Sequence, residues 1–130
     1  MKAPDIVIVE DNKDCQFLLE EFMNLFGYTT ISFSSAEEAI PYCKTQLCQP
    51  KVFLIDISLP GLNGIEFLET IKDYPQIQKS KKIAATVMAF ADDIALLKSK
   101  GFDDIFTKPI NFTKIEKQLK VHVKDFALSA

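Results

Sequence analysis

Residues 52–61 decide the fold, and they read VFLIDISLPG. Four apolar residues run without a break into a single acid, Asp56, and Pro60 and Gly61 then mark a turn. An unbroken apolar run of this length is typical of a strand in a parallel sheet that is covered on both faces. We therefore predict a buried strand at 52–55 with a carboxylate at its carboxyl end.

Similar segments occur on both sides of this stretch. Apolar residues fill 6–9 and make up 83–88 except for Thr86, and a shorter apolar pair stands at 105–106. Residues 28–33 are rich in β-branched and aromatic residues, which favours a strand nearer an edge of the sheet. Together with 52–55, these segments predict five strands.

Helical patterns lie between the strands. Apolar residues recur at intervals of three and four along 15–26, and Gly27 ends that helix. Ser35 and Glu38 predict a capping box for a second helix, which Pro41 keeps short or kinked. Three more helices follow: one with Ile65, Leu68 and Ile71 that stops before Pro75, one from Asp92 to Lys100 that ends at Gly101, and one that Asn111 caps and whose inner face holds Ile115, Leu119 and Phe126.

Five strands that alternate with five helices predict an α/β fold with right-handed crossovers. At this length we expect a flavodoxin-like, doubly wound parallel sheet with the strand order 2-1-3-4-5. Neither a linker nor a repeat divides the chain, so we expect residues 1–130 to form a single domain with no output domain. A sheet of this kind binds ligands beyond the carboxyl ends of its strands, where strands 1 and 3 separate.

Composition excludes several classes of protein. No apolar run reaches the roughly 20 residues of a membrane helix, and the first residues form no signal peptide, so we expect a cytoplasmic protein without a membrane partner. All 15 basic residues are lysines, and without the arginine fork that reads guanine we expect no nucleic-acid partner. Cys15, Cys43 and Cys48 are odd in number and lack C-x-x-C spacing, which predicts free thiols.

Polar residues end four of the predicted strands and should converge on one crevice. These residues are Glu10, Asp11 and Asn12 after the first strand, Asp56 after the third, Thr86 near the end of the fourth, and Lys108 and Pro109 after the fifth. Carboxylates that lie together repel one another, and a divalent cation removes that cost. Ligands that are all oxygen select a hard ion, and Mg2+ fits because it accepts a few carboxylates and keeps several waters.

Each of these residues also has a purely structural explanation. Glu10 and Asp11 could cap the first helix, where negative charge suits the helix dipole. Asp56 could belong to the turn before Pro60, and Lys108 could be a surface lysine. Taken together, these explanations require four unrelated coincidences at four adjoining strand ends.

The sequence resembles the receiver domains of two-component response regulators over nearly its whole length. Three motifs carry the resemblance: Val9-Glu10-Asp11-Asn12, the stretch from Leu54 to Gly64, and the stretch from Gly101 to Pro109. The spacings from Asp56 to Thr86 and from Asp56 to Lys108 also match the family. No single motif is decisive, but the ordered set is highly specific.

The resemblance implies a role for each site residue. Asp56 would attack the phosphohistidine of a histidine kinase or phosphotransfer protein and become an aspartyl phosphate. Asp11, Asp56 and the backbone carbonyl of Ser58 would hold Mg2+, and Glu10 would act through a metal-bound water. Lys108 would neutralise charge on the phosphoryl oxygens, and Thr86 would hydrogen-bond one of them and move the following loop.

The resemblance also bears on what the protein acts upon. Such a protein is not an enzyme with a separate substrate, since it catalyses only its own phosphorylation and slow dephosphorylation. Its signal would leave by docking to a downstream protein, which the sequence does not name. The family's usual docking surface comprises the fourth helix, the fifth strand and the fifth helix, where four lysines cluster: Lys98, Lys100, Lys114 and Lys117.

Three departures from the family pattern matter. Val87 follows Thr86 where a small residue is usual, and a shifted alignment would place Met88 in the threonine position; the gap-free distance from Thr86 to Gly101 favours Thr86. Ile105 replaces the aromatic residue three positions before the lysine, which puts an aromatic-rotamer switch in doubt and leaves Phe106 in the core. Ser58 and Met88 offer no carboxylate or amide to position water, so we expect slow self-dephosphorylation.

Other functions remain in competition. A degenerate receiver would signal by protein contact without phosphorylation, and Val87 and Ile105 leave that hypothesis open. A haloacid-dehalogenase-type phosphatase needs a second acid two residues after its nucleophile, where Ser58 stands. A flavodoxin would not place Glu10 and Asp11 beside a phosphate. The only histidine, His122, is expected to be a partly buried, hydrogen-bonded residue rather than a phosphotransfer histidine.

Overall fold

The computed structural model describes residues 3–87 and 90–128. In these residues five parallel strands form a sheet in the order β2-β1-β3-β4-β5, which confirms the predicted fold. The strands are β1 (Ile6–Val9), β2 (Thr30–Phe33), β3 (Val52–Asp56), β4 (Lys81–Thr86) and β5 (Asp104–Thr107).

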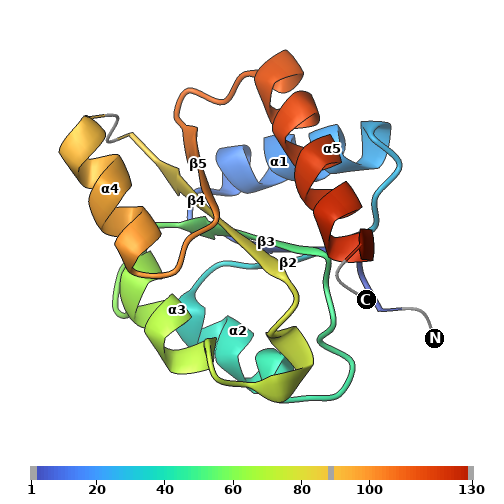
Figure 1. The fold of residues 1–130 in the computed structure, drawn as a ribbon, viewed down its shortest axis with the longest axis vertical. Coiled ribbons are helices and arrows are strands. Elements are labelled where there is room, and N and C mark those ends of the chain that lie inside the picture. The colour runs from blue at the N-terminus through green and yellow to red at the C-terminus, as the bar shows by residue number, and fades with distance from the viewer. Residues whose placement is uncertain (1–2, 88–89, 129–130) are drawn as a thin grey trace.

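Helices cover both faces of the sheet. They are α1 (Lys13–Leu25), α2 (Ala36–Cys43), α3 (Gly64–Ile71), the short 3-10 helix η1 (Pro75–Ile77), α4 (Ala91–Ser99) and α5 (Phe112–Leu128). Figure 1 shows α1 and α5 on one side of the sheet and α2 and α3 on the other. Among these helices none is both long and apolar enough to cross a membrane.

Alternate residues of the central strands pack into two separate hydrophobic cores, one on each face of the sheet. Val7 and Val9 pack toward α2, α3 and α4, whereas Ile6 and Ile8 pack toward α1 and α5. This division follows from the two-residue period of a strand, and it explains why the central strands read as unbroken apolar runs. The carboxyl ends of the strands are thereby held in fixed positions between two packed layers.

The strand β4 begins two residues earlier than the apolar pattern predicts. It includes Lys81 and Lys82, and it ends at Thr86 instead of continuing to Met88, which lies outside the described residues. The buried Lys82 is tolerated because its ammonium donates to the backbone carbonyls of Ile77 and Gln78, at the end of η1. The sequence pattern gives no sign of the contact between Lys82 and these carbonyls, and it did not predict η1.

The predicted helix caps are only partly confirmed. The Ser35 side chain accepts from the backbone nitrogen of Glu38, but the Glu38 carboxylate accepts from Ser34 and not from Ser35, so half of the capping box is absent. With Pro41 inside it, α2 spans eight residues, as expected for a short helix. Asn111 caps α5 as predicted, through the backbone nitrogen of Lys114.

Candidate functional site

The polar strand ends meet at one edge of the sheet. Asp56 is the last residue of β3 and lies opposite Ala85, and Thr86 is the last residue of β4. The backbone nitrogen of Lys108 donates to the carbonyl of Thr86 over 2.8 Å, which extends the pairing of β4 and β5 by one residue. Glu10 follows β1 and is held by its backbone bond to Phe33. The predicted convergence is therefore present.

Three carboxylates form the centre of the site. One carboxylate oxygen each from Glu10, Asp11 and Asp56 lie within 4.8 Å of one another. Glu10 and Asp56 are almost fully buried, with 1% and 4% of their surface exposed, whereas Asp11 is open to solvent. Buried acids at this separation need positive charge nearby, because each disfavours ionisation of the others.

Lys108 supplies part of that charge. Its ammonium donates to Oε1 of Glu10 at 2.7 Å and lies 3.5 Å from Oδ2 of Asp56. Burial acts to lower the pKa of Lys108, but the hydrogen bond and the charge of Glu10, together with the charge of Asp56, outweigh it and raise that pKa. The lysine is therefore firmly charged and is shared unequally between the two acids.

The two buried acids respond in opposite directions. Burial acts to raise the pKa of Glu10, but its interaction with Asp56 and the hydrogen bonds that it accepts from Lys108 and Cys15 outweigh burial and lower it. Burial and the neighbouring Glu10 raise the pKa of Asp56, against the smaller effects of the Ser58 nitrogen and Lys108. Without a bound cation, Asp56 is the acid that is costly to ionise.

The loop after Asp56 is tightly folded. The Oδ1 atom of Asp56 accepts from the backbone nitrogen of Ser58 at 2.9 Å, and the nitrogen of Gly64 donates to the Ile57 carbonyl at 3.1 Å. A Cβ at Gly64 would lie 2.5 Å from the Asp56 carbonyl oxygen, so only glycine fits where α3 approaches β3. These contacts fix where Ser58 lies relative to Asp56.

The residues expected to take part in switching differ in how far they are exposed to solvent. Thr86 is buried with 1% of its surface exposed, and Val87 beside it is 70% exposed. Met88, the alternative to Thr86, lies outside the described residues. Ile105 is buried in the core beneath α2, α3 and α4, and Phe106 is buried in the opposite core as predicted.

Sequence reasoning missed two residues that support Glu10 from the first turn of α1. The Cys15 thiol donates to the Glu10 carboxylate, and the Gln16 amide donates to the Glu10 carbonyl at 3.0 Å. Burial and Glu10 raise the pKa of the Cys15 thiol to about 12, so this cysteine stays protonated. Cys15 and Gln16 follow Glu10 and Asp11 by about one helical turn, and this spacing is the sequence feature that could have indicated the contacts. The three cysteines are free, as predicted.

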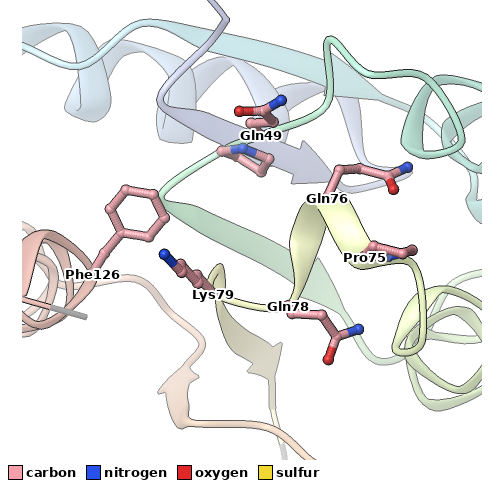
Figure 2. A pocket seen from close by; sticks show the side chains of 7 residues that line it. Gln49, Pro75, Gln76, Gln78, Lys79 and Phe126 are labelled. Carbon is pink, nitrogen blue, oxygen red and sulfur yellow. The ribbon is translucent and has the colours of Figure 1, made fainter. Parts of the chain in front are cut away.

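A hollow elsewhere on the molecule does not belong to this site. It has a volume of about 200 Å³ and is lined by Gln49, Pro50, Pro75, Gln76, Gln78, Lys79 and Phe126. Figure 2 shows Phe126 facing Gln49 and Lys79 across it. Pro50 and Lys79 precede β3 and β4, so the hollow lies at the amino ends of these strands, the opposite edge from the carboxylates.

His122 is partly buried as predicted, but of its two ring nitrogens Nδ1 has no hydrogen-bond partner among the described residues. Its Nε2 atom lies 2.8 Å from Oδ2 of Asp104, and 12% of its side chain is exposed. Gln118 donates to the same carboxylate oxygen at 3.0 Å. The histidine thus ties α5 to β5 and is partly buried, unlike a histidine presented for phosphotransfer.

Comparison with known proteins gives the class of this chain. Residues 6–120 match the response regulator receiver domain family. The chain belongs to this family, whose members are the receiver domains of two-component signalling.

Individual relatives agree with this assignment. The polar-differentiation response regulator DivK of Brucella ovis is 28% identical over 120 residues, which cover 92% of this chain and 96% of that protein. A CheY-like receiver domain protein from Methanospirillum hungatei JF-1 has the same fold, with a TM-score of 0.86, 22% identity and coverage of 99% and 100% of the two chains. A third structure is the receiver domain of the sensor histidine kinase PA1611 from Pseudomonas aeruginosa PAO1, solved with a magnesium ion in its active site cleft. Its TM-score is 0.83 at 23% identity, and the match covers 94% of this chain and 98% of that chain.

Proposed function

We propose that Asp56 accepts a phosphoryl group from the phosphohistidine of a histidine kinase or phosphotransfer protein, with one Mg2+ bound beside it. The aspartyl phosphate then changes a surface that a downstream protein recognises. The observation that carries this proposal is the gathering of Glu10, Asp11 and Asp56 within 4.8 Å, with the Lys108 ammonium 2.7 Å from Glu10. Burying several charged groups together carries a desolvation cost, and a strand end with a purely structural role gains nothing that offsets this cost.

The donor set fits Mg2+. The nearby ligand atoms are carboxylate oxygens, which a hard cation prefers, and exposed Asp11 leaves an open side for water. Asp11, Asp56 and the backbone carbonyl of Ser58 would hold the ion directly, and Glu10 would act through one of its waters. The bound ion supplies positive charge that offsets the charge of the phosphoryl oxygens. The magnesium ion in the PA1611 receiver domain supports this choice.

The transfer itself uses Asp56 and Lys108. A carboxylate oxygen of Asp56 attacks the phosphorus atom, the new O–P bond forms as the N–P bond of the phosphohistidine breaks, and the imidazole nitrogen keeps the electron pair. The Ser58 nitrogen holds Oδ1 of Asp56, which orients the carboxylate. Lys108, 3.5 Å from Oδ2, is placed to bind an oxygen of the incoming phosphoryl group.

Thr86 would report the transfer to the rest of the molecule. It is buried at the end of β4, beside Asp56 across the sheet and joined to Lys108 through the backbone. A hydrogen bond from its hydroxyl to the phosphoryl group would draw the segment after β4 inward. Val87 and Phe90, which are 70% and 80% exposed, lie on that segment and would change the surface shown to a partner.

Ser58 bears on the lifetime of the phosphorylated state. Its side chain is exposed and offers no carboxylate or amide to orient an attacking water. We therefore expect the aspartyl phosphate to be lost slowly, so that the protein catalyses its own phosphorylation but dephosphorylates itself poorly. Phosphate release from the purified phosphorylated protein measures this lifetime, and a lifetime of only seconds contradicts the expectation.

Beryllofluoride, which mimics a phosphoryl group on a carboxylate, separates this proposal from a degenerate receiver. With Mg2+ present, it should shift the backbone amide signals of residues around Asp56, Thr86 and Lys108. Asp56→Asn should show no such shifts. If the unmodified chain gives the same spectrum with and without beryllofluoride and Mg2+, the protein signals without phosphorylation.

A further inference from the structure

The loop between β3 and α3 carries the proposed metal ligand Ser58, and the tip of this loop lies at the surface. Its base is closed by the bond from the Gly64 nitrogen to the Ile57 carbonyl. Pro60 and Gly61 at the tip are exposed, and Leu62 is half-buried. Ile57 and Leu59, on either side of Ser58, are buried in the core, and a contact that holds the exposed tip adds to that anchoring.

Glu37, in the first turn of α2, provides that contact. Its Oε2 atom accepts from the backbone nitrogen of Leu62 at 3.3 Å, across 25 positions of sequence. Gly61 gives a second, independent sign of the same packing, because a Cβ there would collide with the Glu37 carboxylate. Gly61 also has a φ of 71°, a backbone conformation that side chains disfavour. The carboxylate thus lies directly on the backbone of two successive loop residues.

We infer that Glu37 is a positioning residue for the Mg2+ site, an inference that rests on the proposed function. Glu37 touches neither the ion nor the phosphoryl group. It braces the loop against α2, so that the Ser58 carbonyl stays where Asp11 and Asp56 can share a cation with it. Partners that hold metal ligands in place strongly affect metal affinity even when they do not touch the metal.

The adjacent Glu38 is a matched control. It lies in the same helical turn, so replacing either acid removes a similar favourable interaction with the α2 dipole. The Glu38 carboxylate accepts from the Ser34 nitrogen at 3.3 Å, on the loop before α2 and away from the metal loop. A comparison of Glu37→Ala with Glu38→Ala therefore isolates the contact to Leu62 and Gly61.

The first readout is Mg2+ affinity, measured by titrating Mg2+ into each variant and following backbone amide signals. We expect Glu37→Ala to weaken Mg2+ binding about tenfold. Glu38→Ala should bind Mg2+ like the unmodified chain. Glu37→Gln keeps a carbonyl oxygen that can accept from Leu62, and it should restore most of the affinity. Thermal melting of the four proteins shows whether each is folded at the titration temperature.

The second readout is the rate of phosphorylation by a small phosphodonor as a function of Mg2+ concentration. Glu37→Ala should raise the half-saturating Mg2+ concentration about tenfold and leave the rate at saturating Mg2+ nearly unchanged. Equal Mg2+ affinity in Glu37→Ala and Glu38→Ala overturns the role of Glu37, as does a failure of Glu37→Gln to restore binding. If no protein accepts phosphate at any Mg2+ concentration, the proposed function fails instead, and the titration alone decides the role of Glu37.

Discussion

The ammonium of Lys108 lies 2.7 Å from Glu10 and 3.5 Å from Asp56, so the lysine pairs more closely with the acid that is not the proposed phosphoryl acceptor. Glu10 is thereby compensated, whereas Asp56 has the bond from Ser58 and the more distant ammonium of Lys108. In the proposed mechanism, Lys108 binds the phosphoryl group without first breaking a close pair with Asp56. This unequal sharing also makes several effects of substitution predictable.

Replacing Lys108 with Gln should destabilise the fold and slow phosphoryl uptake. In Mg2+-free buffer we expect the free energy of unfolding to fall by about 2 kcal/mol, the usual size of a charged hydrogen bond. Lys120→Gln is the control, because its pair with Glu116 spans 3.8 Å and is largely exposed. Urea denaturation compares the two variants, and equal stability of both would argue against a compensating role for Lys108.

Asp56→Asn should stabilise the protein when Mg2+ is absent. The neutral amide avoids the cost of an ionised carboxylate buried beside Glu10, so we expect the free energy of unfolding to be higher for the variant at pH 7. Folding raises the pKa of Asp56, so the unmodified chain gains stability as the pH falls through the folded-state pKa toward 3.8. The difference in unfolding free energy between the two proteins therefore closes in acid. Mg2+ should also narrow the gap by stabilising mainly the unmodified chain. Denaturation curves that show no gap at pH 7 without Mg2+ would refute this prediction.

Thr86→Ala should separate phosphorylation from the response to it. The variant keeps the three carboxylates and Lys108, so it should still take up a phosphoryl group. Without the hydroxyl, amide shifts induced by beryllofluoride and Mg2+ should stay near Asp56 and not extend to residues around Phe90. Thr86→Ser retains the hydroxyl and should respond like the unmodified chain. A full response in Thr86→Ala would remove Thr86 from the switch.

Asp104 should contribute stability that is lost in acid. Burial acts to raise its pKa, but hydrogen bonds from His122, the Ile105 nitrogen and Gln118 outweigh burial and lower it below 3.8. Its contribution is therefore complete above pH 3.8 and disappears as the pH falls through the folded-state value. Asp104→Asn should cost about 1–2 kcal/mol at pH 6. The exposed Asp125→Asn is the control, and a deficit that persists unchanged at pH 2 would contradict this explanation.

The strand order and the convergence of polar residues could be predicted because both follow from local patterns. Unbroken apolar runs identify central strands, and the carboxyl ends of parallel strands necessarily share one edge. The sequence therefore predicts that Glu10, Asp56 and Lys108 lie close together, although 98 positions separate the first from the last.

Contacts that depend on the register of packed elements could not be predicted in this way. Nothing in the sequence shows that Lys82 ends on the carbonyls after η1, that His122 meets Asp104, or that Glu37 reaches Leu62. Each contact joins two elements whose relative rotation is set by side-chain packing, and a shift of one helical residue would remove it. The same limit explains why β4 was predicted to begin too late.

The central claim is that Asp56 is the phosphoryl acceptor, and one measurement tests it most directly. The purified chain is incubated with a small phosphodonor and Mg2+, and intact mass spectrometry with peptide mapping counts and locates added phosphoryl groups. We expect one group on the peptide that contains Asp56, none in Asp56→Asn, and none when Mg2+ is chelated. Equal uptake by Asp56→Asn, or no uptake by the unmodified chain with Mg2+, would contradict the claim.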